Sequence, residues 1–191
     1  MRSSLRWRLT LTYLSIIMVI LVITYVFFSL SFRDYYYNNV KSDLTRQSIL
    51  VAEMTSYYNS EHDNGLEPFM QSICNRAATD TDTRVTIVNS KGLVLGDSSY
   101  DARYMEPHNN RPEIYQALQG NTGIKVRKSA TAGVNMLYVA VPFDNGSVSG
   151  AVRLSKPLTE VQSFYLKALM ILIIAILVTG IIAYLISREV A

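Results

Sequence analysis

The chain has 191 residues, of which 18 are Lys or Arg and 15 are Asp or Glu, so its formal net charge is +3. Residues 33–165 hold 13 of these basic residues and 14 of the acidic ones, so this middle region is nearly neutral. Because nucleic-acid binding depends on concentrated basic charge, this distribution predicts no nucleic-acid partner. The single cysteine, Cys74, excludes a disulfide within the chain and is expected to be a buried apolar residue.

Two apolar stretches divide the sequence. Residues 9–32 carry no charge, and neither do the residues that follow Lys167 as far as Ser187. Each stretch is long enough to cross the hydrocarbon core of a bilayer as a helix. The predicted organisation is therefore an N-terminal segment at 1–8, a first span at 9–32, a domain at 33–165, a second span at 166–187 and the start of a linker at 188–191. The middle segment has the usual size of one domain with its own core.

Positive charge before the first span predicts the membrane topology. Arg2, Arg6 and Arg8 precede this span, whereas the flank that follows it is mixed. By the positive-inside rule both termini are then cytoplasmic, and residues 33–165 lie outside the cytoplasmic membrane. A cleaved signal peptide is the alternative, with Ser29-Leu30-Ser31 as its small-x-small site. The apolar run is longer than such peptides usually have, which favours an uncleaved anchor.

A helical pattern continues directly from the first span. Apolar residues from Tyr36 to Tyr58 recur every three or four positions, which predicts an amphipathic helix. No Gly or Pro separates this stripe from the span, so we expect one continuous helix. The stripe at Val40, Leu44, Val51 and Met54 is the expected dimer face. A second helix is predicted at residues 66–78, after the turn Asp63-Asn64-Gly65.

From Arg84 the hydrophobic period changes to two, which predicts strands. Runs at 85–89 and 93–97 form one predicted hairpin. A short helix is predicted next at 111–120, because it has Pro near its start and Gly at its end. Three more strands are predicted after this helix, at 123–129, 135–143 and 147–155. The run from Met136 to Val141 is apolar on both faces, which is typical of a strand inside a sheet. A last helix opens near Pro157 and enters the second span. The predicted fold class is α+β, with a five-stranded antiparallel sheet.

The sequence offers little catalytic chemistry. His62 and His108 are expected to be solvated loop residues, and no His or Cys lies at metal-ligand spacing, so neither a catalytic residue nor a metal site is predicted. Arg127 lies on a predicted strand, on one face with Lys125, and Arg111 opens the helix before it. Two interpretations stay open. These arginines could hold an anionic ligand, or they could pair structurally with Asp97 or Glu113.

Three segments carry a resemblance to a known family: "GLVLGDSSYDARYMEPHNNRPEIYQALQGNTG", "KVRKSATAGVNMLYVAVPF" and "GAVRLSKPLTEVQ". They resemble the extracytoplasmic sensors of bacterial histidine kinases of the phosphate-regulon and cell-wall-regulating types, whose sensor is a PAS-like (single Cache) domain between two membrane helices. The resemblance covers residues 84–163 well. The matching residues are Asp97, Ser98, Asn110, Arg111, Pro112, Glu113, Gly120, Arg127, Tyr138, Ala140, Pro142, Arg153, Leu154 and Ser155.

The resemblance implies a function and a set of partners. It implies the signal-sensing and transmembrane-signalling module of a homodimeric sensor histidine kinase in the bacterial cell membrane. A HAMP linker, dimerisation helices and a kinase domain would follow Ala191, so ATP, Mg²⁺ and the response regulator are expected only there, and no cofactor is expected in this chain. The input module of a chemoreceptor or cyclase-type receptor is the alternative. A structural two-span protein that is complete at Ala191 is a third interpretation.

The resemblance also suggests where a stimulus acts. PAS-like domains open a pocket on one sheet face, here beneath residues 98–110. Arg111, Arg127 and Tyr138 are the residues expected to bind a small ligand in that pocket. The other interpretation is a pocket filled by its own side chains, in a sensor that responds to a protein partner or to the state of the membrane.

Overall fold

The computed structural model describes residues 5–58, 65–129 and 133–189. Its first helix, α1 (Leu5–Ser56), is continuous through the first apolar stretch and the amphipathic stripe. This continuity was predicted because no Gly or Pro lies between the two segments. The other helices are α2 (Leu66–Thr81), α3 (Pro112–Leu118) and α4 (Thr159–Glu189), with a short 3₁₀ turn, η1, at Ala102–Tyr104. The predicted turn residues Asp63 and Asn64, and also His62, lie outside the described residues.

Five strands form one antiparallel sheet, as predicted. They are β1 (Arg84–Asn89), β2 (Val94–Asp97), β3 (Gly123–Lys128), β4 (Asn135–Asp144) and β5 (Ser149–Pro157). Their order across the sheet is β2-β1-β5-β4-β3. The doubly apolar run lies in β4, which pairs with β5 on one side and with β3 on the other, so its interior position is confirmed. The middle strand of the five is β5.

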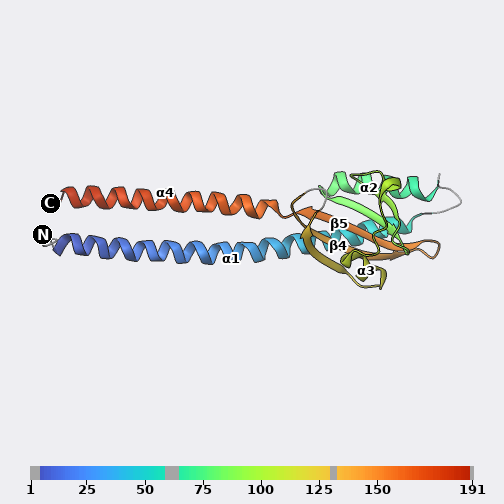
Figure 1. Ribbon diagram of the computed structural model, residues 1–191, viewed down its shortest axis with the longest axis horizontal. Coiled ribbons are helices and arrows are strands. Elements are labelled where there is room, and N and C mark those ends of the chain that lie inside the picture. Colours follow the sequence, from blue (N-terminus) through green and yellow to red (C-terminus); the bar gives the residue numbers. More distant parts are fainter. Residues whose placement is uncertain (1–4, 59–64, 130–132, 190–191) are drawn as a thin grey trace. The chain divides into compact units, whose positions relative to one another are not determined.

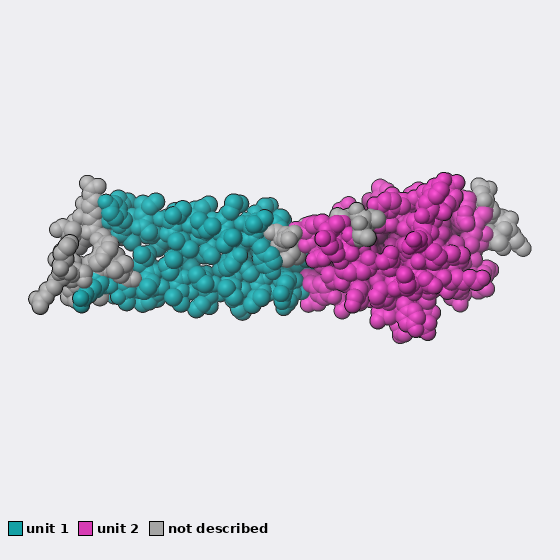
Figure 2. Space-filling view, viewed as in Figure 1, with its two compact units in different colours: residues 1–36, 160–191 teal, residues 37–159 magenta. Residues whose placement is uncertain are grey.

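The chain divides into two compact units, which Figure 2 shows in separate colours. One unit comprises residues 1–36 and 160–191, and the other comprises residues 37–159. In the first unit α1 and α4 run side by side (Figure 1). The rings of Phe32 and Phe164 stack there with centroids 3.6 Å apart, and the Tyr165 hydroxyl donates to the Ser29 carbonyl at 3.2 Å. By length and composition, both helices contain a stretch that could cross a membrane.

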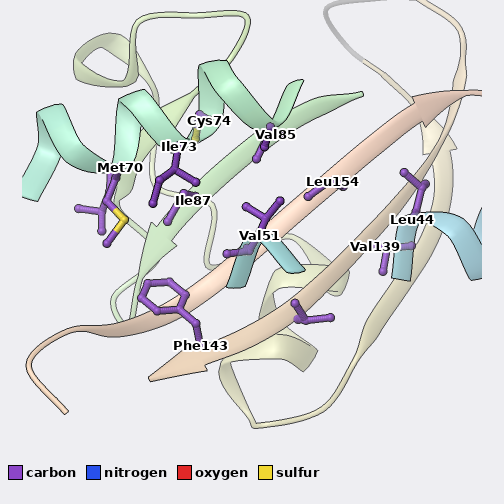
Figure 3. Close-up of a cluster of buried hydrophobic side chains, with 14 of the residues drawn as sticks. Leu44, Val51, Met70, Ile73, Cys74, Val85, Ile87, Val139, Phe143 and Leu154 are labelled. Carbon is purple, nitrogen blue, oxygen red and sulfur yellow. The ribbon is translucent and has the colours of Figure 1, made fainter. Parts of the chain in front are cut away.

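The main hydrophobic core of the second unit lies between one sheet face and the helices α1 and α2. Ile87, Val139 and Leu154 come from the sheet, and Figure 3 shows them with side chains from both helices. Cys74 of α2 is fully buried here, as expected, and burial raises the pKa of its thiol. We call this side of the sheet the apolar face.

Burial in this core corrects the expected dimer face. Leu44 and Val51 are only 1% and 3% exposed, and Val40 and Met54 pack against the same core. The amphipathic stripe of α1 therefore faces the sheet of its own domain, and it leaves no surface for a partner at Leu44 and Val51. Amphipathicity shows that a helix face is buried, but not what covers it.

The opposite side of the sheet is polar, and we call it the polar face. Register places Thr86 beside Arg153, Ala140 beside Arg153, and Tyr138 beside Ser155, so all five side chains share this face. Helix α3 covers part of it through a small apolar cluster made by Val88, Ile114, Ala117, Ala140 and Ala151. The remaining part of this face carries charged residues.

Candidate functional site

The charged part of the polar face begins at the end of β2, with Asp97. Its carboxylate is 1% exposed and accepts two hydrogen bonds from Arg84 Nε at 3.1 Å and one from Arg84 Nη2 at 3.0 Å. The Thr86 hydroxyl donates to Asp97 Oδ2 at 2.7 Å. The backbone N–H groups of Ser99 and Tyr100 also donate to Oδ1. This one carboxylate therefore balances the charge of Arg84 and also binds the first residues of the loop that follows β2.

Thr86 links Asp97 to a second arginine, Arg153, which is buried. Arg153 Nη2 donates to Thr86 Oγ1 at 3.0 Å, and Arg153 is 3% exposed. Burial lowers the pKa of Arg153 to about 10, although the carboxylate of Glu113 acts in the opposite direction. Arg153 therefore stays charged at neutral pH, and this charge needs a partner inside the domain.

Glu113 supplies that partner from α3. It is fully buried, and its Oε1 accepts from Arg127 Nη2 at 3.1 Å and from Arg153 Nη1 at 3.5 Å. The guanidinium of Arg127 lies 4.0 Å from the centre of the Tyr138 ring, and that of Arg153 lies 5.3 Å from it. These four residues form what we call the Glu113 cluster: Glu113, Arg127, Tyr138 and Arg153.

A close backbone contact holds α3 at this position. A Cβ at Gly123 of β3 would lie 1.9 Å from the Glu113 carbonyl oxygen, so only glycine permits this approach. Arg111 occupies the position before Pro112, which starts α3, and both Pro and Glu113 suit the first turn of a helix.

His108 closes the polar face from the loop between β2 and α3. Its backbone N–H donates to the Gly92 carbonyl at 2.8 Å, which holds the loop on the β1–β2 turn. Its side chain is 7% exposed, and burial together with the positive charges of Arg153 and Arg111 lowers its pKa to about 4. The expectation of a solvated loop histidine is therefore wrong, because the loop folds back on the sheet.

The structure brings two of the three predicted ligand residues into contact. Arg127 and Tyr138 stack in the Glu113 cluster, whereas Arg111 lies at the start of α3 with its Nε buried and without a hydrogen-bond partner. The alternative of a structural ion pair is confirmed for Arg127, which pairs with Glu113. Asp97 pairs with Arg84, a residue that no motif singled out.

Sequence reasoning gave no site role to Thr86, His108, Arg153 or Ser155. For the three strand residues a signal was present. Arg153 and Ser155 alternate with Val152 and Leu154 along β5, and polar residues at alternate positions of an otherwise buried strand indicate a polar sheet face. For His108 the sequence held no such signal, because loops have no periodic pattern.

Comparison with known proteins places this fold in a family. The sequence profile of the family described as Single Cache-like matches residues 34–157, which is more than half of the chain. Comparison with curated proteins found no match.

Solved structures with a similar fold include ligand-binding domains. An extracellular ligand-binding receptor from Desulfohalobium retbaense has a TM-score of 0.56 at 14% identity, over 71% of this chain and 25% of that one. The domain of the Campylobacter jejuni chemoreceptor Tlp3 in complex with 4-methylisoleucine has a TM-score of 0.55 at 11% identity, over 85% and 64%. The domain of the Pseudomonas aeruginosa amino-acid chemoreceptor PctC in complex with GABA has a TM-score of 0.51 at 14% identity, over 67% and 61%.

The chain thus spans less than two thirds of each of these structures. At such identities the likeness shows the fold alone, a five-stranded PAS-like sheet with a long N-terminal helix. The family profile covers the same sheet and the second half of α1. The chain belongs to the single Cache-like family.

Proposed function

We propose that the chain is the signal-sensing and transmembrane-signalling module of a two-component sensor histidine kinase. One observation carries this proposal: a single Cache-like domain at residues 34–157 is bounded on both sides by helices with stretches that could cross a membrane. An extracytoplasmic input domain between two spans is the arrangement that transmembrane receptors need.

In this proposal, residues 1–8 and 188–191 are cytoplasmic, residues 9–32 and 166–187 cross the bacterial cytoplasmic membrane, and residues 33–165 sense outside it. The arginines before the first span support this topology by the positive-inside rule. A stimulus shifts the Cache domain between two packings, and α1 and α4 carry the shift across the membrane.

The stimulus in this account is a small molecule bound on the polar face. Two of the similar domains were solved with an amino acid or GABA bound, which supports this class of stimulus. Arg111, Arg127 and Tyr138 are the proposed ligand-binding residues, and Arg153 joins them because it shares the ring of Tyr138 with Arg127. A protein partner or the state of the membrane is the alternative stimulus.

The proposed receptor is a homodimer whose kinase region follows residue 191. That region would bind ATP and Mg²⁺ and would pass the phosphoryl group to a response regulator. The input module of a chemoreceptor or cyclase-type receptor is the second candidate, because the domains of Tlp3 and PctC share this fold.

Phosphorylation of the full-length gene product separates these candidates. The receptor is reconstituted in lipid nanodiscs and incubated with radiolabelled ATP and Mg²⁺. A sensor kinase acquires an acid-labile, base-stable phosphohistidine, and the Arg127→Ala variant alters its rate of formation while Lys128→Ala, an exposed change on the same strand, does not. Absence of phosphohistidine would overturn the kinase assignment.

A further inference from the structure

Two arginines on the polar face, one partly buried and one buried, share one carboxylate. Arg127 and Arg153 approach Glu113 from neighbouring parts of the sheet, and their side chains are 23% and 3% exposed. Two guanidinium charges and one carboxylate leave an excess of one positive charge beside Glu113 and Arg153, which are 0% and 3% exposed. Buried charge without compensation is costly, so this place favours an additional or a better-placed anion.

The carboxylate of Glu113 fits this place poorly. Its Oε1 accepts from both arginines, at 3.1 and 3.5 Å, while its Oε2 is buried without a hydrogen-bond partner. The Nε atoms of Arg127 and Arg153 are also buried without partners. Arginine binds carboxylates best through two parallel hydrogen bonds, one to each oxygen. In this arrangement Glu113 presents only Oε1 to the two arginines.

A free carboxylate is not attached to α3, as Glu113 is. It can turn so that one oxygen meets each guanidinium, and it can then use donor atoms that Glu113 leaves unpaired. The hydroxyl of Ser155, which is 1% exposed and shares a register position with Tyr138, is a further donor without a partner on this face. The polar groups without a hydrogen-bond partner on this face therefore suit a free carboxylate better than they suit Glu113.

We propose that the Glu113 cluster is a carboxylate-binding site that the domain occupies with its own Glu113, and that a small carboxylate ligand binds by replacing this side chain. This inference rests on the proposed sensor function and deepens it, since it names the class of ligand and the event that binding causes. Replacement frees the second residue of α3, a helix of seven residues. The small apolar cluster around Ile114 and Ala117 and the backbone contact at Gly123 then hold α3 on the sheet without its ion pairs, so ligand binding loosens α3.

Chemical rescue of Glu113→Ala tests the site. This substitution removes the internal carboxylate and leaves both arginines unpaired, so the variant of the 191-residue chain in nanodiscs melts at a lower temperature than the wild type. Sodium propionate, which supplies the carboxylate that the substitution removes, should raise the melting temperature of the variant by about 5 °C. Propionamide, which has the same shape without the charge, and sodium chloride at equal ionic strength should leave it unchanged.

Asp101→Ala is the matched control, because it removes a carboxylate from an exposed pair with Arg103. Its melting temperature should not respond to propionate. Failure of propionate to stabilise Glu113→Ala contradicts a carboxylate site, and stabilisation by inorganic phosphate alone contradicts the proposed class of ligand.

A second measurement covers the case in which Glu113→Ala does not fold. Folding of the variant only when propionate is present supports the site. If the variant folds under neither condition, hydrogen–deuterium exchange of the wild type decides. Propionate should speed exchange at residues 112–118 and leave β1 unchanged, and unchanged exchange at α3 overturns the proposal. None of these readouts needs a kinase, so their failure leaves the phosphohistidine test of the proposed function intact.

Discussion

Arg84 and the buried Asp97 form an ion pair across the β1–β2 hairpin, with Nη2 and Oδ2 3.0 Å apart. The Arg84 guanidinium also lies 4.5 Å from the centre of the Tyr100 ring, so one arginine joins the sheet to the loop that covers it. This pair sets the entry of the chain into the loop at residues 98–111.

Asp97→Asn should therefore destabilise the domain strongly. The amide keeps the shape of the side chain but leaves the Arg84 charge without a partner, and breaking a buried pair in this way costs about 3–5 kcal/mol. Urea unfolding of the chain in nanodiscs, followed by near-UV circular dichroism, measures this loss. Asp101→Asn, in the exposed pair with Arg103, serves as the control and should unfold at the wild-type midpoint.

Gly123→Ala should separate α3 from the sheet without changing any charge. The new methyl group would lie 1.9 Å from the Glu113 carbonyl oxygen, so α3 has to move away. Overpacking of this kind costs about 1–3 kcal/mol, and the shift also pulls Glu113 away from Arg127. Thr122→Ala, an exposed change at the preceding residue, should have no effect in the same unfolding assay. Equal stability of the two variants would mean that α3 does not rest on Gly123.

Acid should weaken the domain through His108. Its pKa is about 4 in the folded protein, below the ordinary value of 6.5. The unfolded chain therefore binds this proton first, and the contribution of neutral His108 is complete above pH 6.5 and is lost as the pH falls from 6.5 towards 4. The full contribution is at most about 3 kcal/mol.

The difference between wild type and His108→Gln isolates this effect from the titration of carboxylates. Melting temperatures are measured for both proteins between pH 7 and pH 4.5. The wild type should lose more stability over this range than the variant does. Parallel curves for the two proteins would show that His108 is not held neutral by burial.

The two sides of α1 should behave differently. Leu44→Ala and Val51→Ala should each destabilise the domain, by about 2–4 kcal/mol for the leucine, because both side chains fill the core. In a homodimer, cysteines at these two positions should not crosslink between protomers. Cysteines at Ile49 and Leu50, which are 46% and 59% exposed on the same helix, are accessible to a partner. Crosslinks at Leu44 would contradict the burial of this stripe.

The sequence predicted the sheet well, because alternation and turn residues are local signals. All five strands lie within two residues of their expected bounds at either end, and the predicted faces of β3 are confirmed: Ile124 packs against the core, while Arg127 reaches the polar face. Helix α2 extends three residues beyond its predicted end and reaches Thr81.

The polar face could not be predicted in the same way, because it depends on contacts between distant residues. Arg153 and Glu113 are 40 positions apart, and Thr86 and Arg153 are 67 apart. A local pattern can place each of these residues on a strand face, but only the strand order brings β1, β5 and β4 together beneath α3. The predicted dimer face on α1 was wrong for a related reason. The spacing of apolar residues along α1 does not say whether a sheet or a partner covers Leu44.

Labelling with a membrane-impermeant maleimide in intact cells tests whether the Cache domain lies outside the cytoplasmic membrane. Tyr104→Cys places a thiol on an 86% exposed residue of the Cache domain, and Ser3→Cys and Ala191→Cys place one near each end of the chain. Cys74 can remain, because its thiol is buried and its pKa is raised. We expect Tyr104→Cys to be labelled in intact cells, and the two terminal variants to be labelled only after the membrane is opened. A protected Tyr104→Cys, or a terminal cysteine labelled in intact cells, would contradict an extracytoplasmic sensor held between two membrane spans.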